Sequence, residues 1–117
     1  MDSILTSIKK LLGLSEDDTS FDADIVMYIN SAFSILKQLG IGPVDGYFIS
    51  DKNSTWQDYL GDNYQYEFAD VEIYVYLKVK LWFDSNSLTS SVIESIGKQI
   101  SELEWRINVA IENDTER

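Results

Sequence analysis

Apolar residues recur at helical spacing in three parts of the chain. Residues 3–12 place their apolar side chains on one face, and Gly13 follows as a plausible stop. Residues 20–39 carry a longer apolar stripe that ends at Gly40. Residues 91–110 carry the narrowest stripe of the three. These patterns predict three amphipathic helices.

The ends of these helices have candidate capping residues. Thr19 or Ser20 is expected to cap the second helix, because a hydroxyl at the N-cap accepts a backbone N–H of the first turn. Ser91 and Glu94 have the spacing of a capping box at the start of the last helix.

Residues 67–84 carry two conflicting patterns. Apolar residues alternate from Val71 to Phe83, as in a half-buried strand. On a helix the same residues form two stripes, one through Val71, Val75 and Val79 and one through Ile73, Leu77 and Leu81. The run is long for a strand and contains no turn residue. We therefore favour a helix that is buried on two sides.

Residues 41–66 form an irregular insertion between the helices. Gly40, Gly42, Pro43 and Gly46 break any helix at its start. The segment Tyr47-Phe48-Ile49 is compatible with a short strand, so a short β-hairpin remains open. Ser54 or Thr55 is expected to cap a single helical turn over residues 56–60.

Composition fits one domain and excludes several chemistries. The 117 residues are 44% hydrophobic, enough for one core over residues 1–117, with a flexible polar tail at 112–117. There is no cysteine and no histidine, which removes disulfides, thiolate metal sites and the commonest general base. We therefore expect no catalytic residues, no cofactor and no enzymatic activity.

The formal net charge of −11 disfavours direct binding to nucleic-acid phosphates and favours basic partners. An acidic cluster, from Glu16 to Asp24, lies at the entry of a predicted helix, where the helix dipole stabilises carboxylates. Asp51, Asn53 and Thr55 are spaced like part of a calcium loop, but they are followed by Trp56 where such a loop needs glycine. We expect no metal site.

Two apolar groups are candidates for a protein interface. Trp105 and Val109 lie opposite the complete apolar stripe of the last predicted helix, and tryptophan is a frequent anchor at interfaces. The alternative is that a neighbouring helix covers them within the same subunit. Tyr47, Phe48 and Ile49 in the insertion form the second group. No apolar run approaches the roughly 20 residues of a membrane span, and the N-terminus lacks a signal-peptide pattern, so we expect no membrane contact.

The order of several segments resembles a known family. The N-terminal segments are Ser7-Ile-Lys-Lys-Leu-Leu-Gly13, Asp24-Ile-Val-Met-Tyr-Ile-Asn-Ser31 and Gln38-Leu-Gly-Ile-Gly-Pro43. The later ones are Tyr74-Val-Tyr-Leu-Lys-Val-Lys-Leu-Trp-Phe-Asp84 and Ile100-Ser-Glu-Leu-Glu-Trp-Arg-Ile-Asn-Val109. Together they resemble the small head–tail connector, or head-completion, proteins of phages and prophages of Gram-positive bacteria. Relatives often have prolines where this chain has Ser85-Asn86.

The resemblance implies an all-α fold: a small bundle of about four main helices with the irregular insertion, including a helix over 67–84. It implies a structural virion protein, made in the host cytoplasm and located in the neck. Such subunits form a homo-oligomeric ring under the portal protein and dock tail-completion proteins, while DNA passes through without sequence-specific binding. The family has no catalytic residues to transfer.

Two other classes remain as alternatives. An acidic protein that mimics DNA and inhibits a basic host protein would explain the charge, and it would place carboxylates along one face at phosphate-like spacing. A carboxylate-based enzyme is the third possibility, but no constellation of residues supports it.

Overall fold

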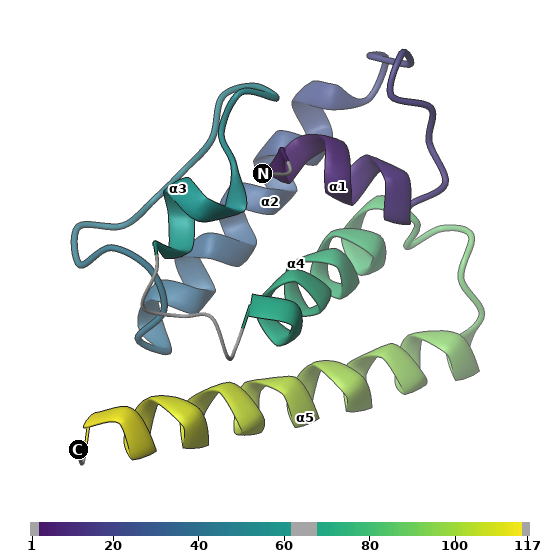
Figure 1. Cartoon of the computed structure of the whole chain (residues 1–117). Helices are drawn as coiled ribbons and strands as arrows, with labels where there is room; N and C mark the ends of the chain where they lie inside the picture. The colour runs from purple at the N-terminus through teal and green to yellow at the C-terminus, as the bar shows by residue number, and fades with distance from the viewer. Residues whose placement is uncertain (1–2, 62–67, 116–117) are drawn as a thin grey trace.

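A computed structural model of the chain describes residues 3–61 and 68–115. Within them the protein is a small helical bundle (Figure 1). The helices are α1 (Ile4–Leu11), α2 (Asp22–Gln38), α3 (Trp56–Leu60), α4 (Phe68–Phe83) and α5 (Ser90–Thr115). The prediction of an all-α bundle with four main helices is confirmed.

The helix α4 forms the centre of the bundle. It packs against α2 and α5, and α1 packs against both α2 and α4. Figure 1 shows α5 at the bottom, α4 above it and α1 near the top. Val71, Val75 and Val79 of α4 are fully buried, as is Tyr74. A helix with neighbours on two sides needs apolar residues on two sides, which explains the alternating pattern. The choice of helix for residues 67–84 is confirmed.

The irregular insertion contains no strand in its described part, residues 41–61. Its one bridge of β type joins Thr55 to Ser3, and the Ile4 N–H donates to the Ser54 carbonyl at 3.0 Å. The possible hairpin is therefore not formed by these residues. Residues 62–66 of the predicted insertion lie outside the described part of the chain.

The helix α5 continues to Thr115, beyond residue 112, where the flexible tail was predicted to begin. Residues 116–117 of that predicted tail lie outside the described part of the chain.

Two of the expected helix caps are wrong. The N-cap of α2 is Phe21, which has no capping side chain. Thr19 and Ser20 instead belong to the preceding turn, in which the Ser20 N–H donates to the Asp18 carboxylate at 3.0 Å. At α5, Thr89 takes the place expected for Ser91, because its hydroxyl accepts the Val92 N–H at 3.3 Å.

The cap expected for the short helix α3 is correct. Thr55 forms a full capping box with Asp58: the Thr55 hydroxyl accepts the Asp58 N–H, and the Asp58 carboxylate accepts the Thr55 N–H. Both partners lie within one turn, so this cap depends on local sequence alone.

Candidate interaction surfaces

The insertion is fixed to α2 by one asparagine side chain. Asn30 Oδ1 accepts the Ile49 N–H at 2.7 Å, and Asn30 Nδ2 donates to the Ile49 carbonyl at 3.0 Å. A side-chain amide thus supplies the two hydrogen bonds that a neighbouring strand would supply. The backbone of the insertion is therefore satisfied at this point without a sheet.

One turn along α2 from Asn30, an aromatic ring also packs against the insertion. The Phe33 ring of α2 lies 4.1 Å from Tyr59, 5.8 Å from Tyr47 and 6.4 Å from Trp56, measured between ring centroids. Gly42 lies so close to Tyr59 that an added Cβ would sit 2.6 Å from the ring. These contacts turn an irregular segment into part of the core.

The predicted patch Tyr47-Phe48-Ile49 is divided by this packing. Ile49 lies in the core with 2% of its surface exposed, and Tyr47 is half-buried against Phe33. Phe48 points outward and is 75% exposed. Of the three residues, Phe48 is the one available to a partner.

The second predicted patch lies on the outer face of α5. Trp105 is 67% exposed, and Val109 is half-buried. The opposite face of the helix carries Ile96, Ile100, Leu103 and Ile107, all buried. Trp105 therefore stays a candidate contact residue, because tryptophan is favoured where one side of a ring binds a partner.

Polar contacts support the inner face of α5. The Tyr74 hydroxyl of α4 donates to Glu104 Oε2 at 2.7 Å. Burial of the ring, together with this bond to a carboxylate, raises the pKa of Tyr74 well above its usual value. Arg106 Nε lies 3.9 Å from Asp70 Oδ2 across the same helix pair. These contacts fix the rotation of α5 and hence the outward direction of Trp105.

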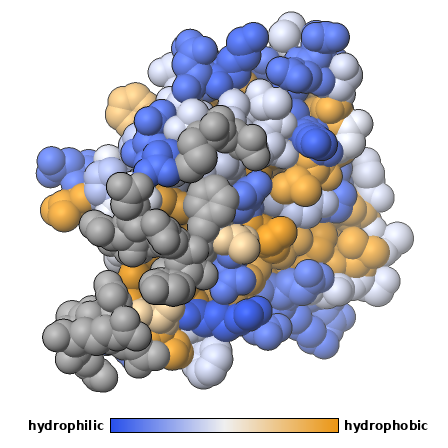
Figure 2. Space-filling model, viewed as in Figure 1, coloured by the Kyte–Doolittle hydropathy of each residue, from blue (hydrophilic) through white to orange (hydrophobic). Residues whose placement is uncertain are grey.

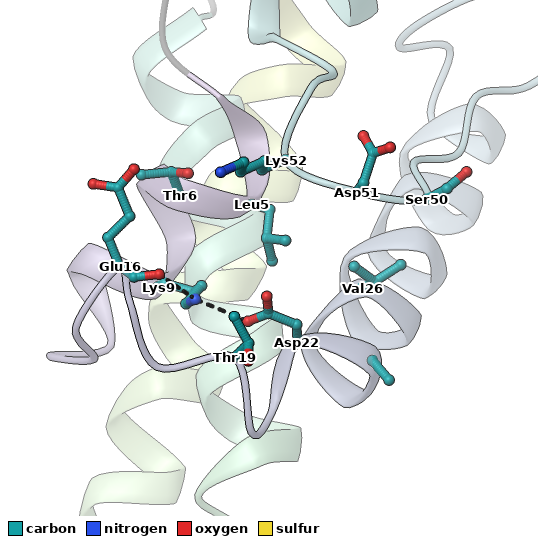
Figure 3. Close-up of a pocket in the computed structure, with 11 residues that line it drawn as sticks. Leu5, Thr6, Lys9, Glu16, Thr19, Asp22, Val26, Ser50, Asp51 and Lys52 are labelled. Atoms are coloured by element: carbon teal, nitrogen blue, oxygen red, sulfur yellow. Dashed lines mark hydrogen bonds and ion pairs between the residues drawn. The ribbon is translucent and has the colours of Figure 1, made fainter.

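A cavity of about 610 Å³ opens between α1, the start of α2 and residues 50–52 of the insertion (Figure 3). Leu5 and Val26 contribute its apolar wall. Lys9, only 3% exposed, borders it and forms an ion pair with Asp22 at 2.9 Å. The Lys9 ammonium also donates to the Glu16 carbonyl at 3.1 Å. Its charge is thus compensated within the protein.

Among the residues that the structure describes, the acidic side chains do not gather into a metal site. In the described ranges, no three carboxylates converge as metal ligands would. Ser20, through its backbone N–H and its hydroxyl, lowers the pKa of the Asp18 carboxyl, so these groups serve the turn before α2. None of the helices in the described ranges combines the length and apolar character needed to cross a bilayer.

The surface is of mixed character. Figure 2 shows hydrophilic residues along the top and the lower rim, with hydrophobic residues gathered between them. This band lies at the level of α4 in Figure 1. Ile73 of α4 is one of the exposed apolar side chains of the molecule.

A comparison with protein families gives a match over nearly the whole chain. The profile of the family described as phage connector protein matches residues 4–114, from the first residue of α1 almost to the end of α5. The chain belongs to the phage connector protein family. No curated protein and no solved structure shows significant similarity to it.

Membership confirms the resemblance seen in the sequence and supports a structural connector role in the virion, in association with other phage head and tail proteins. The family is structural, which favours a non-enzymatic protein.

The sequence did not reveal Asn30 or Lys9 as organising residues. An asparagine inside a helix is unfavourable by propensity, and that was the one available hint.

Proposed function

We propose that this protein is the head–tail connector subunit that forms a ring beneath the portal and docks the tail. The observation that carries the proposal is the family match, which extends over α1 to α4 and nearly all of α5. The match thus rests on the bundle as a whole and not on one of its helices.

The surface of the subunit is compatible with assembly. A closed ring of identical subunits uses two unlike surfaces on each subunit, because each contact joins the front of one copy to the back of the next. Phe48 on the insertion and Trp105 on α5 provide exposed aromatic anchors on separate elements. Further surface remains for the portal and the tail-completion proteins.

The charge of the chain fits a channel for DNA. Acidic residues outnumber basic ones by 20 to 9, and carboxylates repel phosphates. DNA passes such a wall without sequence-specific binding. The location that follows is the neck of the virion, after synthesis in the host cytoplasm. The alternative of a DNA-mimicking inhibitor predicts instead a protein that never enters particles.

The test is deletion of the gene from the phage genome, followed by electron microscopy and plaque assays. We expect filled heads without the connector ring and without tails, and rescue by the wild-type gene supplied in trans. Trp105→Ala should fold normally but restore fewer tailed particles. Met27→Ala, which shortens another exposed apolar side chain, is the control that should restore wild-type numbers. Normal infectious particles in the absence of the gene would refute the proposal.

A further inference from the structure

We infer that the groove between α4 and α5, together with Trp105, binds a basic, arginine-bearing segment of a different virion protein. This contact rests on the proposed function and specifies the chemistry of one partner that the connector subunit docks. Trp105 then contacts that partner, and the exposed Phe48 remains available for contacts between copies.

The groove has an apolar part and a polar rim. It has a volume of about 280 Å³ and opens between α4 and α5, which lie side by side in Figure 1. Buried Leu103 and Ile73, which is 41% exposed, are its apolar lining. The rest of the lining is polar and consists of Asp70, Gln99, Glu102 and Arg106. Such a groove suits a long side chain with an apolar stem and a charged end, as arginine and lysine have.

Trp105 stands next to this groove on α5. Glu102 precedes it by three residues, so the two side chains are neighbours on the helix surface. Glu102 also lines the groove and therefore joins the groove to the tryptophan. The indole is 67% exposed, and no ring or cation of the described residues lies against it. It is thus open to a cation, which tryptophan binds better than other aromatic side chains do.

The uncompensated charges around Trp105 are negative. Both cations of α5 already have a carboxylate partner, Lys98 on α5 itself at 3.6 Å and Arg106 on α4 at 3.9 Å. Glu102 and Glu112 are exposed, and neither has an ion-pair partner in the described part of the chain. A basic partner therefore gains two carboxylates without displacing a cation.

The same charges select among the possible occupants. A second copy of this chain has a net charge of −11 and is disfavoured, because like charges across an interface are repulsive. Phosphate groups are repelled for the same reason. A metal ion lacks ligands, since no three carboxylates converge in the described ranges. The occupant that fits is a basic segment of another protein.

Arginine fits Trp105 and Glu102 at the same time. Its planar guanidinium stacks on an indole ring while its N–H groups donate two parallel hydrogen bonds to a carboxylate. The ammonium group of lysine is a point charge and has no plane with which to stack. We therefore expect an arginine at the centre of the contact.

The contact can be tested by photo-cross-linking in assembled particles. Gln99, an exposed residue of the groove, is replaced by the photoreactive residue p-benzoylphenylalanine, which leaves Trp105 and Glu102 intact. Phages are purified and irradiated, and cross-linked peptides are identified by mass spectrometry. We expect cross-links to one segment of a different virion protein, with a net positive charge and at least one arginine.

A matched pair of charge reversals distinguishes the groove from the acidity of the whole chain. Glu102→Arg reverses the charge beside Trp105, and Glu16→Arg makes the same change at an exposed position before α2, outside the groove. Circular dichroism checks that both variants fold. Glu102→Arg should lower the cross-linking yield about tenfold or more, because it places two positive groups face to face. Glu16→Arg should leave the yield unchanged.

Charge exchange with the partner completes the test. Replacing the arginine of the cross-linked segment by glutamate should lower the yield in particles with Glu102, and it should restore the yield in particles with Glu102→Arg. No recovery in the exchanged pair would overturn the pairing of Glu102 with that arginine.

Four further outcomes overturn the inference while the connector role stands: cross-links to a second copy of this chain, cross-links to a segment without arginine, no cross-links although the variant protein is present in particles, and equal yields from the two charge reversals. Absence of the wild-type protein from purified particles would refute the proposed function itself, and the contact would fall with it.

Discussion

The insertion and α5 show opposite relations between regularity and burial. The insertion has no repeating hydrogen-bond pattern between Ile41 and Ser54, yet its side chains reach the core through Ile41, Ile49 and Trp56. The helix α5 has 26 residues of regular structure, yet its outer face is exposed and carries Trp105.

The two regions therefore have different roles in this small domain: the insertion packs internally, and α5 exposes one of its faces. The insertion is held by specific contacts with distant residues, so its shape is set before any partner binds. The helix α5 satisfies its own backbone and needs only one apolar face, which leaves the other face free for assembly. The irregular backbone of the insertion thus serves internal packing at Ile41, Ile49 and Trp56 and leaves Phe48 exposed, whereas the whole outer side of α5 is a candidate contact surface.

The strongest test of this comparison exchanges one tryptophan in each region for alanine. Trp56 is 1% exposed, so Trp56→Ala should lower the free energy of unfolding by about 3–5 kcal/mol. Trp105→Ala should change it by less than about 0.5 kcal/mol, since the ring lies mostly in solvent. Urea unfolding followed by circular dichroism measures both. Similar losses for the two variants would mean that Trp105 is part of the core.

A second test uses two glycines with similar backbone angles. Gly42 has φ of +90° and Gly13 has φ of +82°, so alanine is strained at both positions. An added Cβ at Gly42 would meet the Tyr59 ring at 2.6 Å, whereas at Gly13 nothing lies within 4 Å. Gly42→Ala should cost about 3 kcal/mol and Gly13→Ala about 1 kcal/mol, the difference being the clash. Equal melting temperatures for the two variants would show that Tyr59 moves aside for the added methyl group at little cost in stability.

The helices could be predicted because the features that specify them, apolar spacing and terminal glycines, lie close together in the sequence. The apolar spacing in α1, α2 and α5 repeats every turn, and the glycines that end α1 and α2 adopt positive φ. For α4 the alternating pattern pointed to a strand, and only length and family resemblance favoured a helix. Its burial between α2 and α5 accounts for that ambiguity.

The anchoring of the insertion and the cavity were not predictable, because their partners are far apart in sequence. Asn30 and Ile49 are 19 residues apart, and nothing in either segment indicates their pairing. Lys9 resembles an ordinary surface lysine at the edge of an amphipathic helix, yet it is buried by its ion pair with Asp22. The patch Tyr47-Phe48-Ile49 was proposed as a unit, whereas tertiary packing directs Ile49 inward and Phe48 outward.

The contribution of the Asn30 clamp can be measured with Asn30→Asp. The carboxylate still accepts the Ile49 N–H, but it cannot donate to the Ile49 carbonyl and repels it. We expect a loss of about 2 kcal/mol in stability and faster hydrogen exchange at the insertion, with α5 unaffected. Ser34→Asp adds the same charge at an exposed position of α2 and should change exchange little. Uniformly faster exchange along the chain would show that the clamp stabilises the whole bundle and not the insertion in particular.

The smallest expected effect concerns the polar contact beneath α5, tested with Tyr74→Phe. At neutral pH the variant loses the bond to Glu104, and we expect a cost of about 1 kcal/mol. The folded state holds the pKa of Tyr74 above the unfolded value near 10, first by burial and then by the bond to Glu104. The wild type is therefore fully stabilised below about pH 10 and loses stability above it, because the unfolded tyrosine releases its proton while the folded one keeps it.

Tyr74→Phe lacks this titration, so the stability difference between wild type and variant should shrink as the pH rises beyond 10. Thermal melts of both proteins from pH 7 to pH 11 measure it, and the double variant with Glu104→Gln isolates the coupling between the two groups. A difference that stays constant over the whole range would mean that the hydroxyl is as free to ionise in the folded protein as in the unfolded chain. The outward direction of Trp105 would then depend on the buried stripe of Ile96, Ile100, Leu103 and Ile107 and on the contact between Arg106 and Asp70.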